Sequence, residues 1–162
     1  MDKNIQGNFM AMPLSKPGLA QIEKEGHYVL YNDTGVSLIN LDYPKSINVG
    51  ISECTMVGMA CGLASEGHKV YCFAVTPHFL RAWEFVRTLL VPRNYNVIIC
   101  GMGEGEDFAS LGHSHQMGWE EMELHCRAAK IEYRKPITFD GFQQLLSMRG
   151  PLFIQIPKRI LA

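Results

Sequence analysis

The sequence predicts an α/β domain: a three-layer, doubly wound and mainly parallel sheet with helices on both faces. Short apolar segments bounded by glycine or proline alternate with longer segments of helical spacing, which is the pattern of such folds. Residues 70–75 are apolar throughout and lie between Gly67 and Pro77, as expected for a strand buried on both faces. The 162 residues are 47% hydrophobic and 19% charged, so they can form one domain with a substantial core.

Elements in the N-terminal half follow from turn residues and from breaks in the apolar pattern. Residues 1–15 are polar, methionine-rich and aperiodic, so we expect an N-terminal arm and a folded domain over 16–162. The first strand ends at Asp33, and Pro44 breaks regular structure in the loop that follows. The elements expected here are a helix over 16–25, strands over 27–32 and 47–49, a loop over 34–46, and a helix that begins near Ser52.

The C-terminal half continues the alternation of strand and helix. After the strand over 70–75, apolar side chains recur on one face of a predicted helix over 79–90: Phe79, Ala82, Trp83, Val86 and Leu90. The remaining elements expected are strands over 96–100, 131–134 and 152–156, a glycine-rich loop over 101–112, and helices over 119–129 and 139–149.

Composition excludes several classes of protein. Fifteen basic and 16 acidic side chains give a net charge of -1 without a basic cluster, so binding to nucleic acid or to a membrane surface is not expected. We therefore expect neither a signal peptide nor a membrane-spanning segment, since no apolar stretch is long enough to span a bilayer. The five cysteines include no CxxC pair, which favours reduced thiols and a cytoplasmic location over a zinc site.

Glu53 is the most informative residue because it opens a helix whose body carries no charge. From Thr55 to Ala64 every side chain is apolar or uncharged. One role is structural, since a carboxylate in the first turn of a helix stabilises it by about 0.3–1 kcal/mol. The other is functional, since a carboxyl in an apolar setting can hydrogen-bond a ligand nitrogen or carry a proton.

Further candidate residues lie where the predicted strands end, the edge at which doubly wound sheets bind ligands. They are Asp33, His78, the loop histidines His113 and His115, and Lys158. The two loop histidines lack a third metal ligand at suitable spacing, so no metal site is expected. Proton transfer or substrate binding by one of them is the sharper hypothesis.

Two other motifs are weaker. The loop that starts at Gly101 has Glu106 where the dinucleotide-binding motif needs its third glycine, so we expect a mobile loop beside a site instead. Cys54 follows Glu53 directly, and the carboxylate would oppose the thiolate that a cysteine nucleophile requires.

The run GISECTMVGMACGLASEGHKVY, residues 50–71, resembles the pyrimidine-binding (Pyr) domain of transketolase-type thiamine diphosphate enzymes. The likeness continues through 79–87, through Ser114-His115-Gln116, and through Gly150-Pro151 before the last strand. It covers about residues 16–160, so the resemblance implies the Pyr fold for nearly the whole chain.

The resemblance also implies roles for individual residues. Glu53 matches the glutamate that hydrogen-bonds the aminopyrimidine ring of thiamine diphosphate, and His115 would face the substrate carbonyl. Where the family usually stacks aromatic rings on the pyrimidine, this chain has Val75 and His78, with Phe79 next to them. These three are the expected cofactor contacts. Weaker candidates for substrate contacts are Asp33, His113 and Lys158.

The family binds the diphosphate through Mg2+ on a separate PP domain that carries a Gly-Asp-Gly motif, and the sequence has none. The resemblance therefore implies a stand-alone Pyr subunit of a split enzyme, in a heterodimer or a heterotetramer with a PP-domain partner that holds the metal. The expected activity is transketolase-like two-carbon transfer. A subunit of a 2-oxo acid decarboxylase or acyloin synthase, and a non-catalytic partner of a PP subunit, stay open as alternatives.

Overall fold

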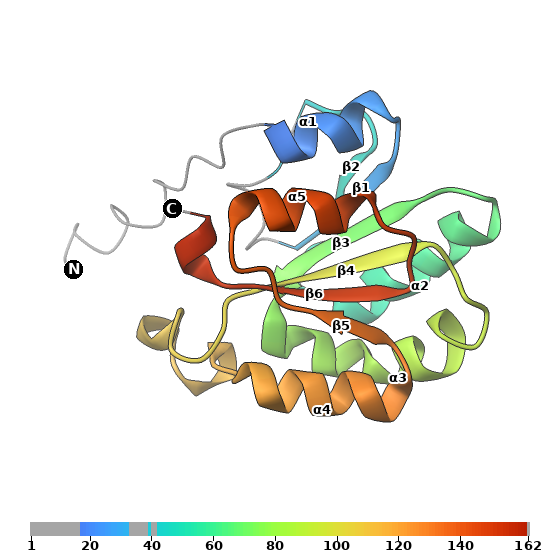
Figure 1. The fold of residues 1–162 in the computed structure, drawn as a ribbon. Coiled ribbons are helices and arrows are strands. Elements are labelled where there is room, and N and C mark those ends of the chain that lie inside the picture. The colour runs from blue at the N-terminus through green and yellow to red at the C-terminus, as the bar shows by residue number, and fades with distance from the viewer. Residues whose placement is uncertain (1–16, 33–38, 40–41, 162) are drawn as a thin grey trace.

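The architecture was determined from a computed structural model that describes residues 17–32, 39 and 42–161. Within these residues six strands form one sheet in the order β2-β1-β3-β4-β6-β5, and all neighbouring strands run parallel (Figure 1). The predicted arm over 1–15 and Asp33 lie outside the described residues. The strands are β1 (Tyr28–Tyr31), β2 (Ser46–Asn48), β3 (Val70–Val75), β4 (Val97–Met102), β5 (Glu132–Arg134) and β6 (Leu152–Ile156).

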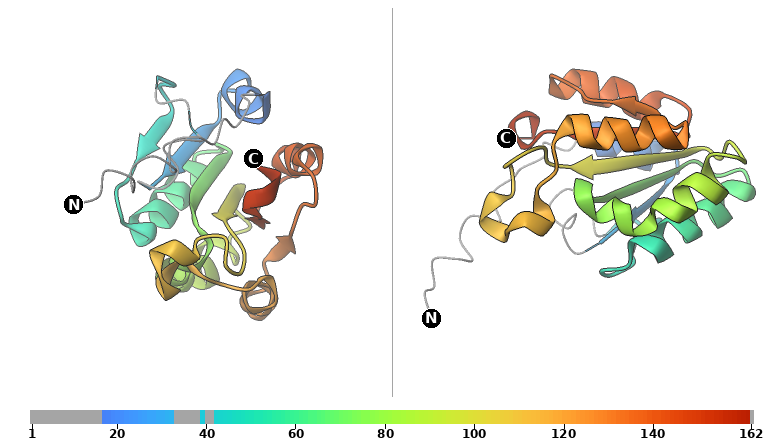
Figure 2. Two further views of the ribbon diagram at one scale, coloured as in Figure 1. Left: turned by 90° about the vertical axis from the view of Figure 1, so that its left-hand side faces the viewer. Right: turned by 90° about the horizontal axis from the view of Figure 1, so that it is seen from below.

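Helices cover both faces of the sheet, which confirms the three-layer fold predicted from the sequence. One face carries α1 (Pro17–Lys24) and α5 (Phe139–Ser147), and the other carries α2 (Glu53–Ser65), α3 (Trp83–Phe85) and α4 (Trp119–Ala129) (Figures 1 and 2). No helix among the described residues is long and apolar enough to cross a membrane.

Each face of the central strands contributes to a separate hydrophobic core. In β3, Cys72 and Ala74 pack with the helix α2 side of the molecule, whereas Tyr71 and Phe73 pack with the α5 side. All six residues of β3 are buried. Burial on both faces explains why this strand is apolar at every position and lacks the alternation of a half-exposed strand.

Most predicted boundaries agree with the structure within two residues. The main extension is β4, which continues beyond Cys100 because Gly101 and Met102 still pair with Gln155 and Ile156 of β6. The sequence predicts a loop for these two residues because the segment is rich in glycine. The glycine-rich loop therefore begins at the same edge of the sheet at which β6 ends.

The helix predicted over 79–90 begins earlier and is irregular. A 3₁₀-helix, η2 (Thr76–Ala82), starts directly after β3, and α3 leads into a π-helix, η3 (Val86–Leu90). Pro77 suits a first helical turn, and the Thr76 hydroxyl donates to the carbonyls of Met102 and Gly103 at 3.1 and 2.8 Å. The side chains expected on one face do pack inward, with Trp83 only partly buried.

We predict that Gly150→Ala destabilises the fold, because a Cβ there would lie 2.1 Å from the backbone oxygen of Val97. Overpacking against backbone costs about 1–3 kcal/mol of unfolding free energy or more. Urea denaturation followed by circular dichroism measures this. Gly62→Ala is the matched control: its Cβ meets no atom within 4 Å, and a helical alanine should add about 0.5–1 kcal/mol. Equal stability of the two variants would contradict the packing described here.

Candidate functional site

The candidate site lies where the strand order changes direction. From β1 the chain goes to β2 on one side, and α2 then carries it back to β3 on the other side of β1. A crevice beyond the carboxyl ends of the strands at such a point is where doubly wound sheets bind ligands. The buried polar residues at this point include Asn32 after β1, Glu53 at the start of α2, and His78 after β3.

Glu53 is the first residue of α2, and its side chain is only 1% exposed. Asn32 donates from Nδ2 to Oε1 at 3.2 Å, and a guanidinium nitrogen of Arg81 lies 3.4 Å from each carboxylate oxygen. A buried carboxylate needs such donors to offset its lost hydration. The positive end of the α2 dipole stabilises the same charge. The structural and the functional role of Glu53 are therefore compatible.

His78 is the second buried polar group of the site. Its Nδ1 lies 3.6 Å from Oε1 of Glu53, which is too far for a hydrogen bond. Neither ring nitrogen has a hydrogen-bond partner among the described residues. A buried polar atom left in this state costs about 1–3 kcal/mol. Burial, together with the nearby charge of Arg81, lowers the pKa of His78 although Glu53 acts in the opposite direction, so the ring is neutral at neutral pH.

His115 completes the group from a different part of the chain. It ends a short 3₁₀-helix, η5 (His113–His115), that follows Gly112, whose φ of 89° is a conformation that favours glycine. Its ring meets that of His78 edge to face, with centroids 4.7 Å apart, and Nδ1 contacts the Ser114 hydroxyl at 3.0 Å. The structure thus brings together Glu53, His78 and His115.

The other predicted contacts lie elsewhere. Val75 and Phe79 have no exposed surface, and Phe79 packs edge to face on Phe153 with ring centroids 5.8 Å apart. Both lie in the core behind the site, and their contact with a cofactor stays a prediction. His113 is exposed on the same turn as His115. Lys158 is exposed at the end of β6, where its Nζ lies 5.8 Å from the centre of the Phe108 ring.

Sequence reasoning missed two contributors to the site, Asn32 and Arg81. Asn32 directly precedes Asp33, so the sequence identified the end of β1 as a site but did not single out Asn32. Arg81 lies three residues after His78, the spacing that places side chains on one side of a helical turn. This spacing could have identified Arg81 from the sequence, and the position of Asn32 at a strand end could have identified Asn32.

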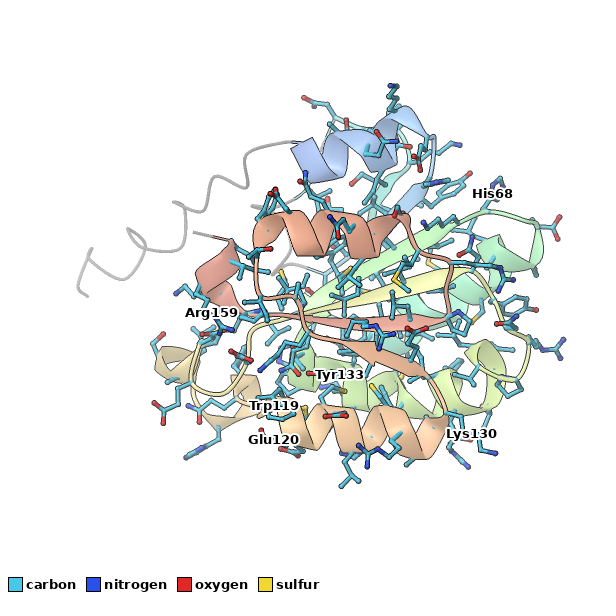
Figure 3. All side chains as sticks on the ribbon, viewed as in Figure 1. His68, Trp119, Glu120, Lys130, Tyr133 and Arg159 are labelled. Carbon is cyan, nitrogen blue, oxygen red and sulfur yellow. The ribbon has the colours of Figure 1, made fainter. Side chains whose placement is uncertain are left out.

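Several polar contacts link the glycine-rich loop to its surroundings, and its mobility stays a prediction. Oδ2 of Asp107 accepts from the backbone nitrogens of Glu104 and Lys158 at 2.9 and 2.7 Å. Glu104 also pairs with Lys135 at 3.0 Å and with Arg159. Arg159 lies at the end of the sheet opposite His68 (Figure 3). Of the three acidic residues in this loop, Glu104 and Asp107 therefore have a structural role.

No metal or thiol chemistry is evident in the part of the chain that the structure describes. It contains no group of three or more histidine, cysteine, aspartate or glutamate residues that could hold a metal ion. Cys54 is exposed, and its thiol donates to the backbone carbonyl of Arg81 at 3.1 Å. The chemistry that the described side chains support is hydrogen bonding and proton transfer at Glu53 and the two histidines.

Comparisons with known proteins identify related chains. A family model described as "Transketolase, pyrimidine binding domain" matches residues 24–136. The chain is 26% identical over 136 residues to the "Putative transketolase C-terminal section" of Methanocaldococcus jannaschii, a match that covers 80% of this chain and 43% of that protein. It is 27% identical over 121 residues to one subunit of an apulose-4-phosphate transketolase of Actinobacillus succinogenes, covering 69% and 37%. The chain thus spans less than half the length of these relatives.

Two solved structures share the fold. One is described as "Split gene transketolase, inactive beta4 tetramer", with a TM-score of 0.67, 21% identity, and coverage of 85% of this chain and 48% of that chain. The other is a "putative thiamin diphosphate-dependent enzyme isolated from Mycobacterium smegmatis", with a TM-score of 0.59, 15% identity, and coverage of 86% and 29%.

We predict that the stability of the chain falls as the pH drops below about 6.5, the pKa of an unperturbed histidine. Because folding lowers the pKa of His78, the unfolded chain binds this proton more readily, and acid favours unfolding. His78→Phe should lose less stability than wild type when the pH is lowered. Urea denaturation at about pH 7.5 and about pH 5.5 measures it. Exposed His68 offers the control His68→Phe, which should keep the wild-type pH dependence; an unchanged slope in His78→Phe would refute the assignment.

Proposed function

Because the chain belongs to the family of transketolase pyrimidine-binding domains, we propose that it acts as the Pyr subunit of a split, thiamine diphosphate-dependent, transketolase-like enzyme. The observation that carries the proposal is Glu53: a buried carboxylate at the point where the strand order reverses. In the sequence resemblance, Glu53 matches the family's cofactor-activating glutamate. The reaction proposed is the transfer of a two-carbon ketol unit, or a related carboligation.

The residues at the site fit the proposed cofactor. The Glu53 carboxyl can bond a ring nitrogen of an aminopyrimidine and hold or pass on its proton. Asn32 and Arg81 fix both oxygens of that carboxyl in place. Nδ1 of His78 lies 3.6 Å from Oε1 of that carboxyl, and neither nitrogen of the His78 ring has a hydrogen-bond partner among the described residues. Thiamine diphosphate, when bound, supplies an electron sink for bond making and breaking next to a carbonyl.

His115 is the proposed contact to the substrate. It comes from the loop that follows β4, so it approaches the Glu53 region from a separate element, and its ring is already oriented by His78 and Ser114. A half-buried imidazole can donate to a carbonyl oxygen on which negative charge develops, or transfer a proton to it. Asp33, His113 and Lys158 are proposed as weaker substrate contacts.

The loop contacts bear on the class of substrate. The acidic residues Glu106 and Asp107 are the nearest match to a family pair that precedes the active-site histidine. Asp107, however, is engaged with the backbone of Glu104 and Lys158, which leaves it unsuited to a sugar hydroxyl. This favours a substrate other than an ordinary ketose phosphate. A 2-oxo acid decarboxylase or acyloin synthase subunit is therefore the second candidate, and product analysis with ketoses and 2-oxo acids separates the two.

The exposed face of α2 supports association with a partner chain. The helix is apolar or uncharged on all sides from Cys54 to Ser65, a character typical of a helix that is buried all round. One side packs in the core. The other leaves Cys54, Thr55, Met59 and Gly62 exposed, and Phe85 next to Gly58 is 39% exposed.

We propose that a PP-domain subunit covers this face of α2 and, because Glu53 begins the same helix, completes the site at that end. The Mg2+ ligands are placed on that partner, since the sequence has no Gly-Asp-Gly motif. A heterodimer or a heterotetramer with two copies of each chain is the proposed assembly. The descriptions of the relatives as a "C-terminal section", as one subunit of a transketolase and as a "split gene" protein support the division between two chains.

We predict that Glu53→Gln in the complex with the PP partner lowers the turnover rate by about 100-fold or more, because an amide cannot exchange a proton at the ring nitrogen. Steady-state product formation measures the effect. Glu66→Gln is the matched control, since Glu66 is exposed at the other end of α2, and it should match wild type. Wild-type turnover by Glu53→Gln would show that the proton role is wrong.

We predict that Gly62→Gln weakens association with the PP partner by about tenfold or more, equivalent to ~1.4 kcal/mol. The side chain has free space within the chain itself, so the melting temperature of the isolated chain should not fall. Analytical ultracentrifugation of the mixed chains measures the association. Leu124→Gln is the control: it changes a residue on α4 that is 65% exposed, and this variant should bind the partner like wild type. If Gly62→Gln bound the partner as tightly as Leu124→Gln, the partner would not bind at this face of α2.

A further inference from the structure

The two ring nitrogens of His78 make no hydrogen bond within the described part of the chain. The side chain is nevertheless buried next to Glu53. Its contact with His115 is an edge-to-face ring contact, which a phenyl ring would make equally well. Buried polar atoms in native proteins nearly always have partners, and exceptions call for an explanation such as a bound group.

The groups around His78 favour the neutral form of its ring. The charged and titratable groups that face it are Glu53 from α2, Arg81 from the same helical segment, and His115 from η5. Arg81 is engaged with both oxygens of Glu53, so the carboxylate already has a cationic partner. A neutral imidazole offers one donor and one acceptor, and at His78 neither is taken up by the described residues.

We propose that His78 is a ligand-binding residue that hydrogen-bonds the nitrogen-containing ring held at Glu53, in addition to any stacking contact. The inference rests on the proposed function and assigns a polar role to a position where the family resemblance implies only an aromatic surface. Because Nδ1 of His78 lies 3.6 Å from Oε1 of Glu53, one edge of a flat heteroaromatic amine can reach both groups. The carboxyl and the imidazole together then favour a ring that carries two polar atoms.

The test separates the ring from its nitrogens. His78→Phe keeps an aromatic ring of similar shape and removes the polar atoms, whereas His78→Gln removes the ring and keeps a donor and an acceptor. Titration calorimetry with thiamine diphosphate and Mg2+ on the complex with the PP partner measures affinity directly. We expect His78→Phe to weaken binding by about tenfold and His78→Gln by less than about threefold.

A stability measurement tests whether weaker binding by His78→Phe results from damage to the fold. The isolated His78→Phe chain should melt, at about pH 7.5, no lower than wild type, because the two nitrogens make no hydrogen bond within the described part of the chain. A clear loss of melting temperature would show that the nitrogens have partners within the chain and would overturn the inference.

The binding outcomes distinguish this inference from the function on which it rests. If wild-type complex binds the cofactor and His78→Phe binds it as tightly or more tightly, His78 provides only a ring surface and the polar role is wrong. If the wild-type complex shows no Mg2+-dependent binding at all, the proposed function fails and the inference fails with it. Weak binding by His78→Phe together with near-normal binding by His78→Gln establishes the hydrogen bond.

Discussion

The burial of one carboxylate at the start of an apolar helix is the constraint on which the site depends. Glu53 is nearly inaccessible to solvent, so its charge requires donors from other elements. Asn32 and Arg81 supply them from the ends of β1 and β3. They reach the carboxylate only because β1 and β3 are neighbouring parallel strands, whose carboxyl ends meet at one edge of the sheet. The topology of the sheet therefore creates the environment of Glu53.

Helix α2 links this environment to the outer surface of the protein. Met56, Val57 and Ala60 anchor one side of the helix in the core, and the opposite side offers an uncharged face with Gly58 and Gly62. In the proposed function, the partner chain binds along this face, so assembly and the completion of the site involve the same helix. A rigid helix held on one side by the core is well suited to keep Glu53 fixed while the other side binds a second chain.

The loop between β4 and α4 sets the position of His115. The side chains of Glu104, Asp107 and Gln155 bind backbone or side-chain groups at both ends of the loop. Gln155 is fully buried and donates to the Gly103 carbonyl at 3.0 Å. These contacts hold the segment that presents the His115 ring to His78, and they explain acidic residues that would otherwise appear to be functional.

The sequence by itself determined the fold class, the bounds of β3, α4 and β6, and Glu53 as the residue to examine. These features depend on local patterns: a strand buried on both faces is apolar throughout, and a lone charge at the border of an apolar helix stands out. The tertiary structure alone decided that Asn32 and Arg81, 21 and 28 residues away from Glu53 along the chain, are its partners. It also showed that His78 is buried without partners among the described residues and that the segment after β3 is an irregular helix. Hydrogen-bond partners depend on which strands become neighbours, and that order arises from packing between distant parts of the chain.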